Sequence, residues 1–468
     1  MSYKRIEDTR IPVSQKLSEI DPEIAWQAWQ SSPESPWNAE RARLLFRRGG
    51  FGASPEDLEY ALKRSPSQIV DRMLGDFGGK KNQEFEQESS QIASSVRVGG
   101  DAERLAAWWL HRMIHSPSPL REKMTLFWHG HFATGADKVT DSELMFAQNQ
   151  LFRKHAMGDF RELVHDISKD AAMLIYLDSE SNRKSHPNEN YARELMELFC
   201  LGEGNYTERD VQELARCFTG WEVRRKMFRF NPYQHDSGRK TLLGAEDIES
   251  GESAIDVVLR QAEMPFFVVE KLFRYFVCDE LPPSKALLQP LVNRFIESGF
   301  KTESVVRQIL ESELMLSLWP VGKKIRSPVE FALNLIRGLD ATTNLDRLAK
   351  ALKPLGQALF FPPNVKGWDG GRAWINSSTL IGRSNFVVDL LADGNTRFHG
   401  GTLDEWVKSQ RISSVDGWME WLSNSLLAMP LKPEEKIRWK DQVSSITNTD
   451  LWRGALIALS RNARLQLS

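Results

Sequence analysis

Residues 188–221 carry the pattern that most restricts how this chain can fold, because their apolar side chains recur with the period of an α-helix. Tyr191, Leu195 and Phe199 share one apolar face, and charged residues occupy the positions between them. Gly202 follows, and glycine is the residue type that most often ends a helix. We therefore predict a helix over the first half of this stretch.

The second half of the stretch has the signals of another helix. Thr207 and Asp210 have the spacing of a capping box, in which each side chain bonds a backbone N–H of the other residue. Val211, Leu214 and Phe218 then form an apolar stripe. The stretch is thus predicted to be two helices joined by a glycine-containing turn.

Helical segments of this kind recur along the chain. Ser54-Pro55 and Ser65-Pro66 each place a capping residue before a proline, as at the first turn of a helix. After Trp221 the pattern changes to partial alternation, which is typical of strands. We therefore predict a mainly α protein, one large multi-helix body with a small β-hairpin inserted near residues 222–243.

Composition along the chain predicts three segments. Residues 1–36 are expected to form an N-terminal arm, residues 37–400 the helical core, and residues 401–468 a helical tail packed on that core. Within the core, residues 80–100 are rich in Lys, Gln, Glu, Ser and Gly and show little periodicity. Such a composition is typical of loops, so we predict a mobile loop there.

The balance of charges limits the classes of partner. The net charge is −2, so the chain has no general attraction to nucleic acid or to an anionic membrane. The N-terminal segment carries charges throughout and lacks the apolar region of a signal peptide. No window reaches the roughly 18 apolar residues of a membrane span. We expect a cytoplasmic protein that neither spans a membrane nor binds nucleic acid.

Tryptophan and cysteine usage adds two expectations. Fifteen tryptophans against seven tyrosines indicate either a strongly aromatic core or an exposed aromatic groove. The three cysteines are widely spaced and form no CxxC pair. Cys200 and Cys217 lie on the two predicted central helices, where we expect buried apolar groups and not a disulfide.

A metal site is the first chemical hypothesis, and a divalent metal is the cofactor it implies. His129 and His131 are metal-ligand residue types, and Glu194 and His235 could complete a mixed site. Residues two apart on a helix point in nearly opposite directions, so both histidines converge only if the helix ends near Gly130. In the alternative interpretation, one histidine caps the helix end and the other packs in the core.

Acids on the first central helix could also serve proton transfer. Glu194 and Glu197 are three residues apart and share a face, so Glu197 could act as a base. Arg193 is four residues from both Glu189 and Glu197, and could orient the acids or bind an anionic group. The alternative interpretation is a set of solvated ion pairs on the outside of the helix.

The pair His235 and Asp236 offers a second base, because a histidine beside a carboxylate can move a proton. Either Glu197 or Asp236 would then be the base, while Arg193 would orient the acids or bind an anionic group. The alternative is ordinary turn chemistry, since Asp-Ser-Gly follows the histidine.

Residues 360–371 form a predicted rigid loop with two prolines and three glycines. Loops of this composition commonly carry function. Lys366 and Trp368 in the loop, and Asn376 shortly after it, are therefore candidate binding residues. The chain has no GxGxxG, GxxxxGK[ST], HExxH or GxSxG pattern, which argues against dinucleotide binding, P-loop phosphotransfer, zincin peptidases and α/β-hydrolases.

Seven stretches, in this order, resemble a bacterial family called domain of unknown function 1800. They are LLFRRGGFGAS at 44–54, MTLFWHGHFAT at 124–134, NENYARELMELFCLG at 188–202, YTERDVQELARCFTGW at 206–221, HDSGRKTLLG at 235–244, RSPVEF at 326–331 and PPNVKGWDGGRAWINSSTLIGR at 362–383. Together they extend over roughly residues 40–390 and form a specific set.

The resemblance implies a largely helical fold and supplies no catalytic assignment. Many members of the family follow an export signal, which this sequence does not show. Members are often encoded beside a second family, domain of unknown function 1501, which looks like a sulfatase or phosphatase relative. The resemblance therefore implies a protein of that second family as a partner.

Two functional hypotheses follow from the sequence. The first is a metal-dependent hydrolase, with His129, His131, Glu194 and His235 as ligands. The second is a non-catalytic scaffold that binds a sulfatase- or phosphatase-like partner, with Lys366 in its binding loop. The arrangement of these side chains in space distinguishes the two.

Overall fold

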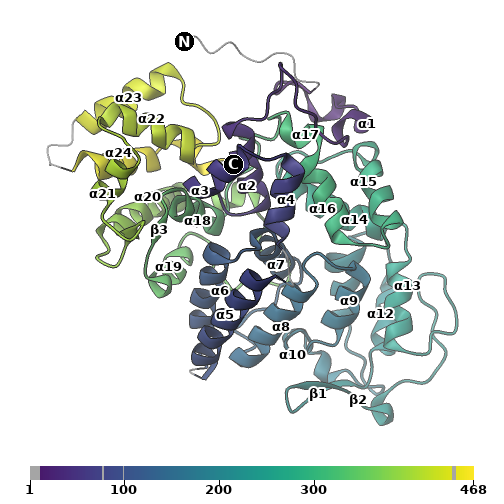
Figure 1. The fold of residues 1–468 in the computed structure, drawn as a ribbon. Coiled ribbons are helices and arrows are strands. Elements are labelled where there is room, and N and C mark those ends of the chain that lie inside the picture. The colour runs from purple at the N-terminus through teal and green to yellow at the C-terminus, as the bar shows by residue number, and fades with distance from the viewer. Residues whose placement is uncertain (1–10, 76–78, 99, 445–449) are drawn as a thin grey trace.

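The computed structural model describes residues 11–75, 79–98, 100–444 and 450–468. Helices dominate this part of the chain, and its strands form two antiparallel two-stranded sheets (Figure 1). The prediction of a mainly α fold is therefore confirmed. The division into arm, core and tail stays a prediction.

Two of the first helices begin at the serine-proline pairs, as predicted. Ser54 and Ser65 each cap a helix through a capping box, with proline in the first turn. In the arm, the side chain of Trp26 is buried and its Nε1 donates to Leu287 O at 2.6 Å, which anchors this segment to a distant helix. The helices are α1 (Pro22–Ala25), α2 (Ala39–Gly49), α3 (Pro55–Ala61) and α4 (Pro66–Leu74).

Residues 80–98 form helix α5 (Lys80–Val98), so the prediction of a loop over 80–100 is wrong. The buried side of α5 consists of Asn82, Phe85, Ser89 and Ala93, which recur at helical spacing. Two of these four side chains are polar, which hid the period from a search for apolar residues. Trp108 Nε1 donates to Ser89 Oγ at 2.9 Å, so a neighbouring helix satisfies this buried hydroxyl.

The middle of the chain places successive helices side by side (Figure 1). These are α6 (Ala102–His115), α7 (Pro119–His131), α8 (Ser142–Lys154), α9 (Phe160–Ser168) and α10 (Ala171–Tyr176). The predicted central helices follow as α11 (Asn190–Glu194), the π-helix η3 (Leu195–Cys200) and α12 (Glu208–Cys217). Thr207 and Asp210 form the capping box of α12. Cys200 and Cys217 are buried and free, as expected.

A β-hairpin follows at residues 221–230, so it is shorter than the predicted range of 222–243. Strand β1 (Trp221–Arg224) pairs with β2 (Met227–Phe230) across Arg225 and Lys226, whose φ angles of 52° and 64° are left-handed. A two-residue turn of this kind usually contains Asn-Gly, so the sequence hid it. Residues 240–243, at the end of the predicted range, form no strand.

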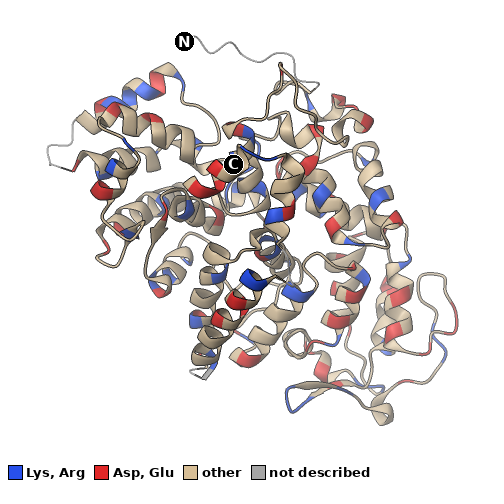
Figure 2. Cartoon of the chain, viewed as in Figure 1, with Lys and Arg blue, Asp and Glu red and all other residues tan. Residues whose placement is uncertain are grey.

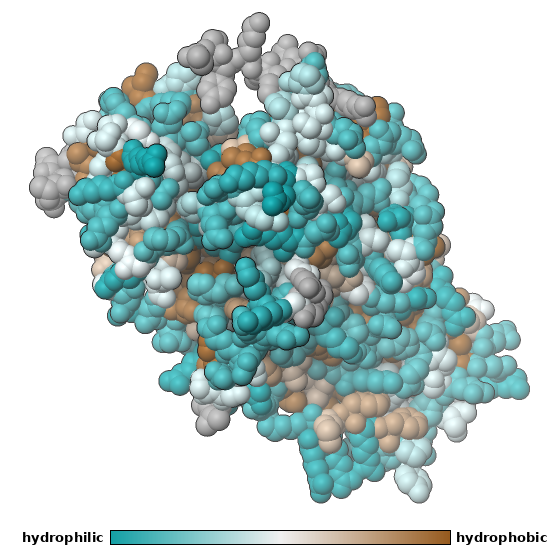
Figure 3. Space-filling model, viewed as in Figure 1, coloured by the Kyte–Doolittle hydropathy of each residue, from teal (hydrophilic) through white to brown (hydrophobic). Residues whose placement is uncertain are grey.

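The hairpin lies at the lower edge of the molecule in Figure 1, and its tip is basic in Figure 2. Met227 and Phe230 are exposed, and Figure 3 shows apolar atoms in this region.

The remaining helices complete the body and pack on its N-terminal half. Strand β3 (Ala341–Thr342) pairs with β4 (Arg397–Phe398). The helices are α13 (Gly251–Leu259), α14 (Glu263–Phe276), α15 (Lys285–Glu297), α16 (Thr302–Glu311), α17 (Glu313–Leu316), α18 (Pro328–Gly338), α19 (Leu345–Leu352), α20 (Ser377–Ala392), α21 (Leu403–Ser409), α22 (Val415–Leu426), α23 (Pro433–Ser444) and α24 (Leu451–Ser460).

Buried arginines bind the C-terminal helices to the rest of the body. Arg326 donates to Leu465 O at 3.0 Å and to Leu426 O at 2.8 Å, while Arg47 donates to Leu427 O at 3.1 Å. Carbonyls at the ends of helices lack intrahelical partners, so these guanidinium groups satisfy acceptors that would otherwise be buried unpaired. The yellow C-terminal helices accordingly lie near the purple N-terminal ones in Figure 1.

The tryptophans belong to the interior. None of the fifteen is exposed, and six of the largest fully buried side chains are tryptophans. The aromatic-core alternative therefore holds, and the exposed aromatic groove is absent from the described structure. Among the described residues, no helix is both long and apolar enough to cross a membrane.

Candidate functional site

The predicted central helix changes from α to π geometry at Leu195. The N–H groups of Leu201 and Gly202 both donate to Met196 O, at 2.8 and 3.1 Å. The π-helical segment η3 carries Glu197, and Glu194 immediately precedes it. Short π-helical segments are rare and occur often at functional sites, so this segment is a candidate for one.

His131 caps the end of this helix. Its Nε2 lies 3.0 Å from Phe199 O, and its Nδ1 lies 3.2 Å from Lys271 Nζ. Because an ammonium can only donate, Nδ1 accepts from Lys271 and Nε2–H donates to the carbonyl. Lys271 also donates to Leu198 O at 2.7 Å. Both nitrogens of His131 are therefore used, one by a carbonyl of η3 and the other by Lys271 of α14, which also bonds a carbonyl of η3.

Burial at this cap lowers the pKa values of both His131 and Lys271. Burial, together with the charge of Lys271, holds the pKa of His131 well below its usual value, so the ring is neutral. Burial also lowers the pKa of Lys271 to about 8. The sequence analysis missed Lys271, although a lysine inside the apolar run EMPFFVVEKLFRYF was a visible signal.

His129 packs in the core on the opposite side of the same turn. Its Nε2 accepts from the backbone N–H of Phe360 at 3.2 Å, and its ring lies 5.2 Å from the ring of Trp109. Burial lowers the pKa of His129 to about 3. One histidine thus caps a helix and the other packs, which is the arrangement of the alternative interpretation.

The loop at residues 360–371 lies directly against this histidine turn. The ring of Trp368 is 5.7 Å from the ring of His129, and it covers Gly130. Gly367 has a φ of 77°, and a Cβ atom there would lie 2.2 Å from Gly130 O. Only glycine tolerates both the conformation and the contact. Two motifs more than 200 residues apart in sequence therefore meet here.

Glu194 and Lys366 bring the acidic helix to the same region. Glu194 is half-buried, and burial followed by repulsion from Glu197 raises its pKa, while Lys366 and Arg193 oppose this shift. Glu197 accepts from the hydroxyl of Tyr206 at 2.6 Å. The charges of Glu197 and Lys366 thus both act on Glu194, and Lys366 precedes Trp368 by two residues in the loop.

Arg193 is bonded to other acids of this region. Its guanidinium bonds Glu208 at 2.7 Å and Glu189 at 3.2 Å, and it makes no bond to Glu197. The expected bridge to Glu197 fails because the helix widens after Glu194 and Tyr206 bonds that carboxylate. Ion pairs this exposed contribute little stability.

His235 and Asp236 are structural parts of a separate turn. His235 Nδ1 lies 2.8 Å from Thr219 O, and Asp236 Oδ2 accepts from Arg216 Nε at 2.7 Å. Asp236 Oδ1 also accepts from the N–H of Gly238 at 2.8 Å, as in the turn interpretation. Neither residue contacts Glu194 or Glu197 through any bond that the described structure records.

Asn376 is the N-cap of helix α20. Its Oδ1 accepts from Thr379 N at 2.9 Å, and the hydroxyl of Thr379 accepts from the N–H of Asn376 at the same distance. The side chain is nonetheless exposed, which leaves its amide donors accessible to a partner.

The predicted metal ligands do not fit a metal. His129 and His131 direct their nitrogens at backbone groups or Lys271, and His235 belongs to a different turn. In the part of the chain that the structure describes, no three His, Cys, Asp or Glu residues are arranged to hold a metal ion. We therefore derive no chemistry from a metal at these residues.

Comparisons with known proteins identify a family and no closer relative. The model of the family described as "Protein of unknown function (DUF1800)" matches residues 44–461. No curated protein and no solved structure matches the chain. The matched segment includes the histidine turn, the π-helix and the loop over Gly130.

Proposed function

Because this chain belongs to the DUF1800 family, whose description states no function, we propose from its geometry that it is a binding protein. Its docking surface comprises the exposed side chains of residues 363–376 and the outer face of α20. We define this set as the docking surface. The proposed partner is the sulfatase- or phosphatase-like protein of the family named domain of unknown function 1501, which the sequence resemblance implied.

The observation that carries the proposal is an apolar stripe on the outside of α20. Leu380, Ile381 and Val388 are 39%, 62% and 40% exposed. Ile381 and Val388 are seven residues apart, so they lie on one face of the helix. Large apolar side chains gathered on an exposed face commonly mark an interaction site.

The preceding loop supports the same proposal because it is rigidly held. Gly367 and Trp368 fit against the histidine turn, and Arg372 Nε bonds Glu280 at 2.8 Å. A loop fixed in this way loses little conformational entropy on binding, which favours affinity. Lys366 is exposed on it and can meet an acidic group of a partner.

A matched pair of substitutions tests the docking surface. Ile381 on α20 and Ile437 on α23 are both helical and both 62% exposed. In pull-downs with the proposed partner, Ile381→Asp should reduce capture at least about tenfold, as loss of an apolar contact plus a buried charge predicts. Ile437→Asp should leave capture unchanged. Equal effects of the two variants, or no effect of Ile381→Asp, would sink the proposal.

Two further variants distinguish the docking surface from the polar helix. Lys366→Ala should weaken capture, whereas Glu194→Ala should leave capture intact. The reverse result would move the binding site to the acidic helix.

A second candidate function is acid–base catalysis without a metal, at Glu194 and Glu197. It is favoured by the contrast between the half-buried Glu194, whose pKa is raised, and Glu197, which accepts from Tyr206. Pairs of carboxyl groups with different environments often divide the roles of acid and base. Panels of chromogenic phosphate, sulfate and glycoside esters test it. Any activity found should vanish in Glu194→Gln and persist in Glu203→Gln, a change at an exposed neighbour.

A further inference from the structure

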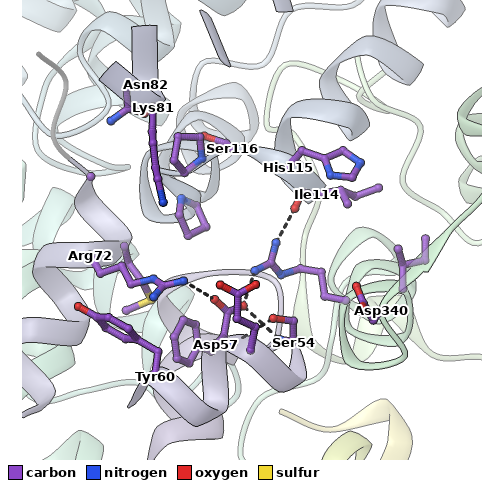
Figure 4. A pocket seen from close by; sticks show the side chains of 18 of the residues that line it. Ser54, Asp57, Tyr60, Arg72, Lys81, Asn82, Ile114, His115, Ser116 and Asp340 are labelled. Atoms are coloured by element: carbon purple, nitrogen blue, oxygen red, sulfur yellow. Dashed lines mark hydrogen bonds and ion pairs between the residues drawn. The ribbon is translucent and has the colours of Figure 1, made fainter. Parts of the chain in front are cut away.

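A cavity of about 840 Å³ shares no lining residue with the docking surface (Figure 4). Helices α3 and α4, the start of α5, the turn between α6 and α7, and the end of α18 with β3 all contribute to its lining. This volume is in the range of sites for small molecules, and the charged lining favours a polar ligand.

Asp57 bonds two arginines that line the cavity. Its Oδ2 accepts from Arg337 Nη2 at 2.8 Å and its Oδ1 lies 3.4 Å from Arg72 Nη2. Arg337 also donates to Gly52 O at 3.0 Å and to Ile114 O at 2.5 Å. The guanidinium of Arg337 is therefore committed to protein groups, and the buried Asp57 is neutralised by it.

Arg72 keeps donors that the protein does not use. Its single contact to a carboxylate is the long one to Asp57, and its guanidinium lies 4.0 Å from the centre of the Tyr60 ring. Stacking on an aromatic ring orients a guanidinium without using its N–H groups. Figure 4 shows Arg72 beside Tyr60 at the edge of the cavity.

Lys81 lines the cavity from the first turn of α5. The side chain is exposed, and the described structure contains no hydrogen bond or ion pair of its ammonium. Helix α5 has 19 residues, and its N-terminal end adds a partial positive charge. Lys81 and Arg72 thus present unsatisfied positive charge to one cavity.

Two of the four acids of the lining are neutralised by arginines. Asp57 bonds Arg337, and Asp71 bonds Arg307 at 2.8 Å. Asp340 bonds the ring of His399 at 2.6 Å. Glu56 lines the cavity as an exposed carboxylate without a recorded ion pair in the described structure. Lys81 and Arg72, which Figure 4 shows on the same side of the cavity, keep N–H donors from which an anion can accept.

We propose that this cavity binds a small molecule through a tetrahedral oxyanion, a phosphate or sulfate group, held between Lys81 and Arg72. Arginine donates to such a group through two parallel N–H bonds, and lysine adds a point charge. The fixed pair of Asp57 and Arg337 keeps Arg72 in place beneath the ligand. The site is independent of the docking surface.

Calorimetric titration of the whole chain with inorganic phosphate and, separately, with sulfate tests the site. We expect saturable binding of at least one of them, and the tighter anion identifies the group. Lys81→Ala should weaken binding about tenfold, since hydrogen bonds to charged groups contribute on this scale. Arg72→Gln should weaken it as well.

Lys63→Ala is the matched control, because Lys63 is an exposed lysine on the turn between α3 and α4, outside the cavity. It should bind phosphate as the wild type does. Unchanged thermal melting of Lys81→Ala without ligand would show that its defect is local. Absence of saturable binding to the wild type, or equal losses in Lys63→Ala and Lys81→Ala, would overturn the proposal. Partner capture by Lys81→Ala should remain normal, which separates this site from the docking surface.

Discussion

Two clusters of acids and arginines in this molecule have the same chemistry and opposite surroundings. In the first, Glu122 is fully buried and bonds Arg112 at 2.9 Å and Arg153 at 2.8 Å. In the second, Arg193 joins Glu189 and Glu208 at the surface. The surface cluster is partly visible in the sequence, because Glu189 and Arg193 are four residues apart. The buried cluster joins three helices and is not visible there.

The difference shows how burial changes the value of one kind of contact. Water screens the surface pairs, so their loss is small. A buried charge has no water to replace a lost partner, so its loss is large. The cluster that is easier to see in the sequence is therefore the one that contributes less to stability.

The largest effect should come from breaking the buried cluster. Glu122→Gln removes the charge that balances Arg112 and Arg153, and we expect unfolding to become easier by about 3–5 kcal/mol. Chemical denaturation followed by circular dichroism measures this. Glu208→Gln in the surface cluster is the control, and a similar loss there would contradict the comparison.

Low pH should remove the stability that Glu122 contributes through its charge. Arg153 and Arg112 overcome the effect of burial and lower the pKa of Glu122 to about 2. This contribution to stability is fully present above the ordinary pKa of 4.5 and is lost as the pH falls toward 2. The shift corresponds to about 3 kcal/mol. Denaturation midpoints of wild type and Glu122→Gln should therefore converge below pH 4.5, and parallel curves would refute this.

The cap on the π-helix should give an intermediate effect. His131→Ala leaves Phe199 O without its donor and creates a cavity, so we expect a loss of about 2–4 kcal/mol. His399→Ala, at an exposed histidine paired with Asp340, should cost less than about 1 kcal/mol. Elemental analysis should find the same metal content in His131→Ala and the wild type. A stoichiometric metal that this variant loses would restore the metal hypothesis.

The smallest effect should come from the surface cluster itself. Arg193→Ala removes both of its ion pairs, and we expect a change below about 1 kcal/mol that disappears in high salt. Denaturation at two salt concentrations measures it. A larger, salt-independent loss would show that Arg193 has a structural role beyond its ion pairs.

The sequence predicted those elements whose causes are local. The capping boxes at Ser54, Ser65 and Thr207 begin helices in the structure because each involves only three consecutive positions beyond the cap. Helix α5 escaped prediction because its buried stripe includes Asn82 and Ser89. Polar residues become a buried face only when another helix covers them.

The candidate site was predicted in part. The sequence identified the histidine turn, the acidic helix and the glycine loop, and the structure brings these three together around Gly130 and Glu194. It did not indicate that the loop covers the turn, nor that Lys271 and Tyr206 join them. The sequence also suggested that His235 belongs to this group, but in the structure His235 lies in a separate turn.

The sequence by itself determined the helices that have caps and apolar stripes, the existence of a hairpin and the family, because periodicity, caps and motifs lie within short stretches. Only the tertiary structure decided what the chemical groups do. The partners of His131 are Phe199 and Lys271, at separations of 68 and 140 residues. A histidine nitrogen can bind a metal or donate to a carbonyl. His131 is buried beside the end of a helix, where a carbonyl without a donor is costly, so its Nε2–H donates to that carbonyl.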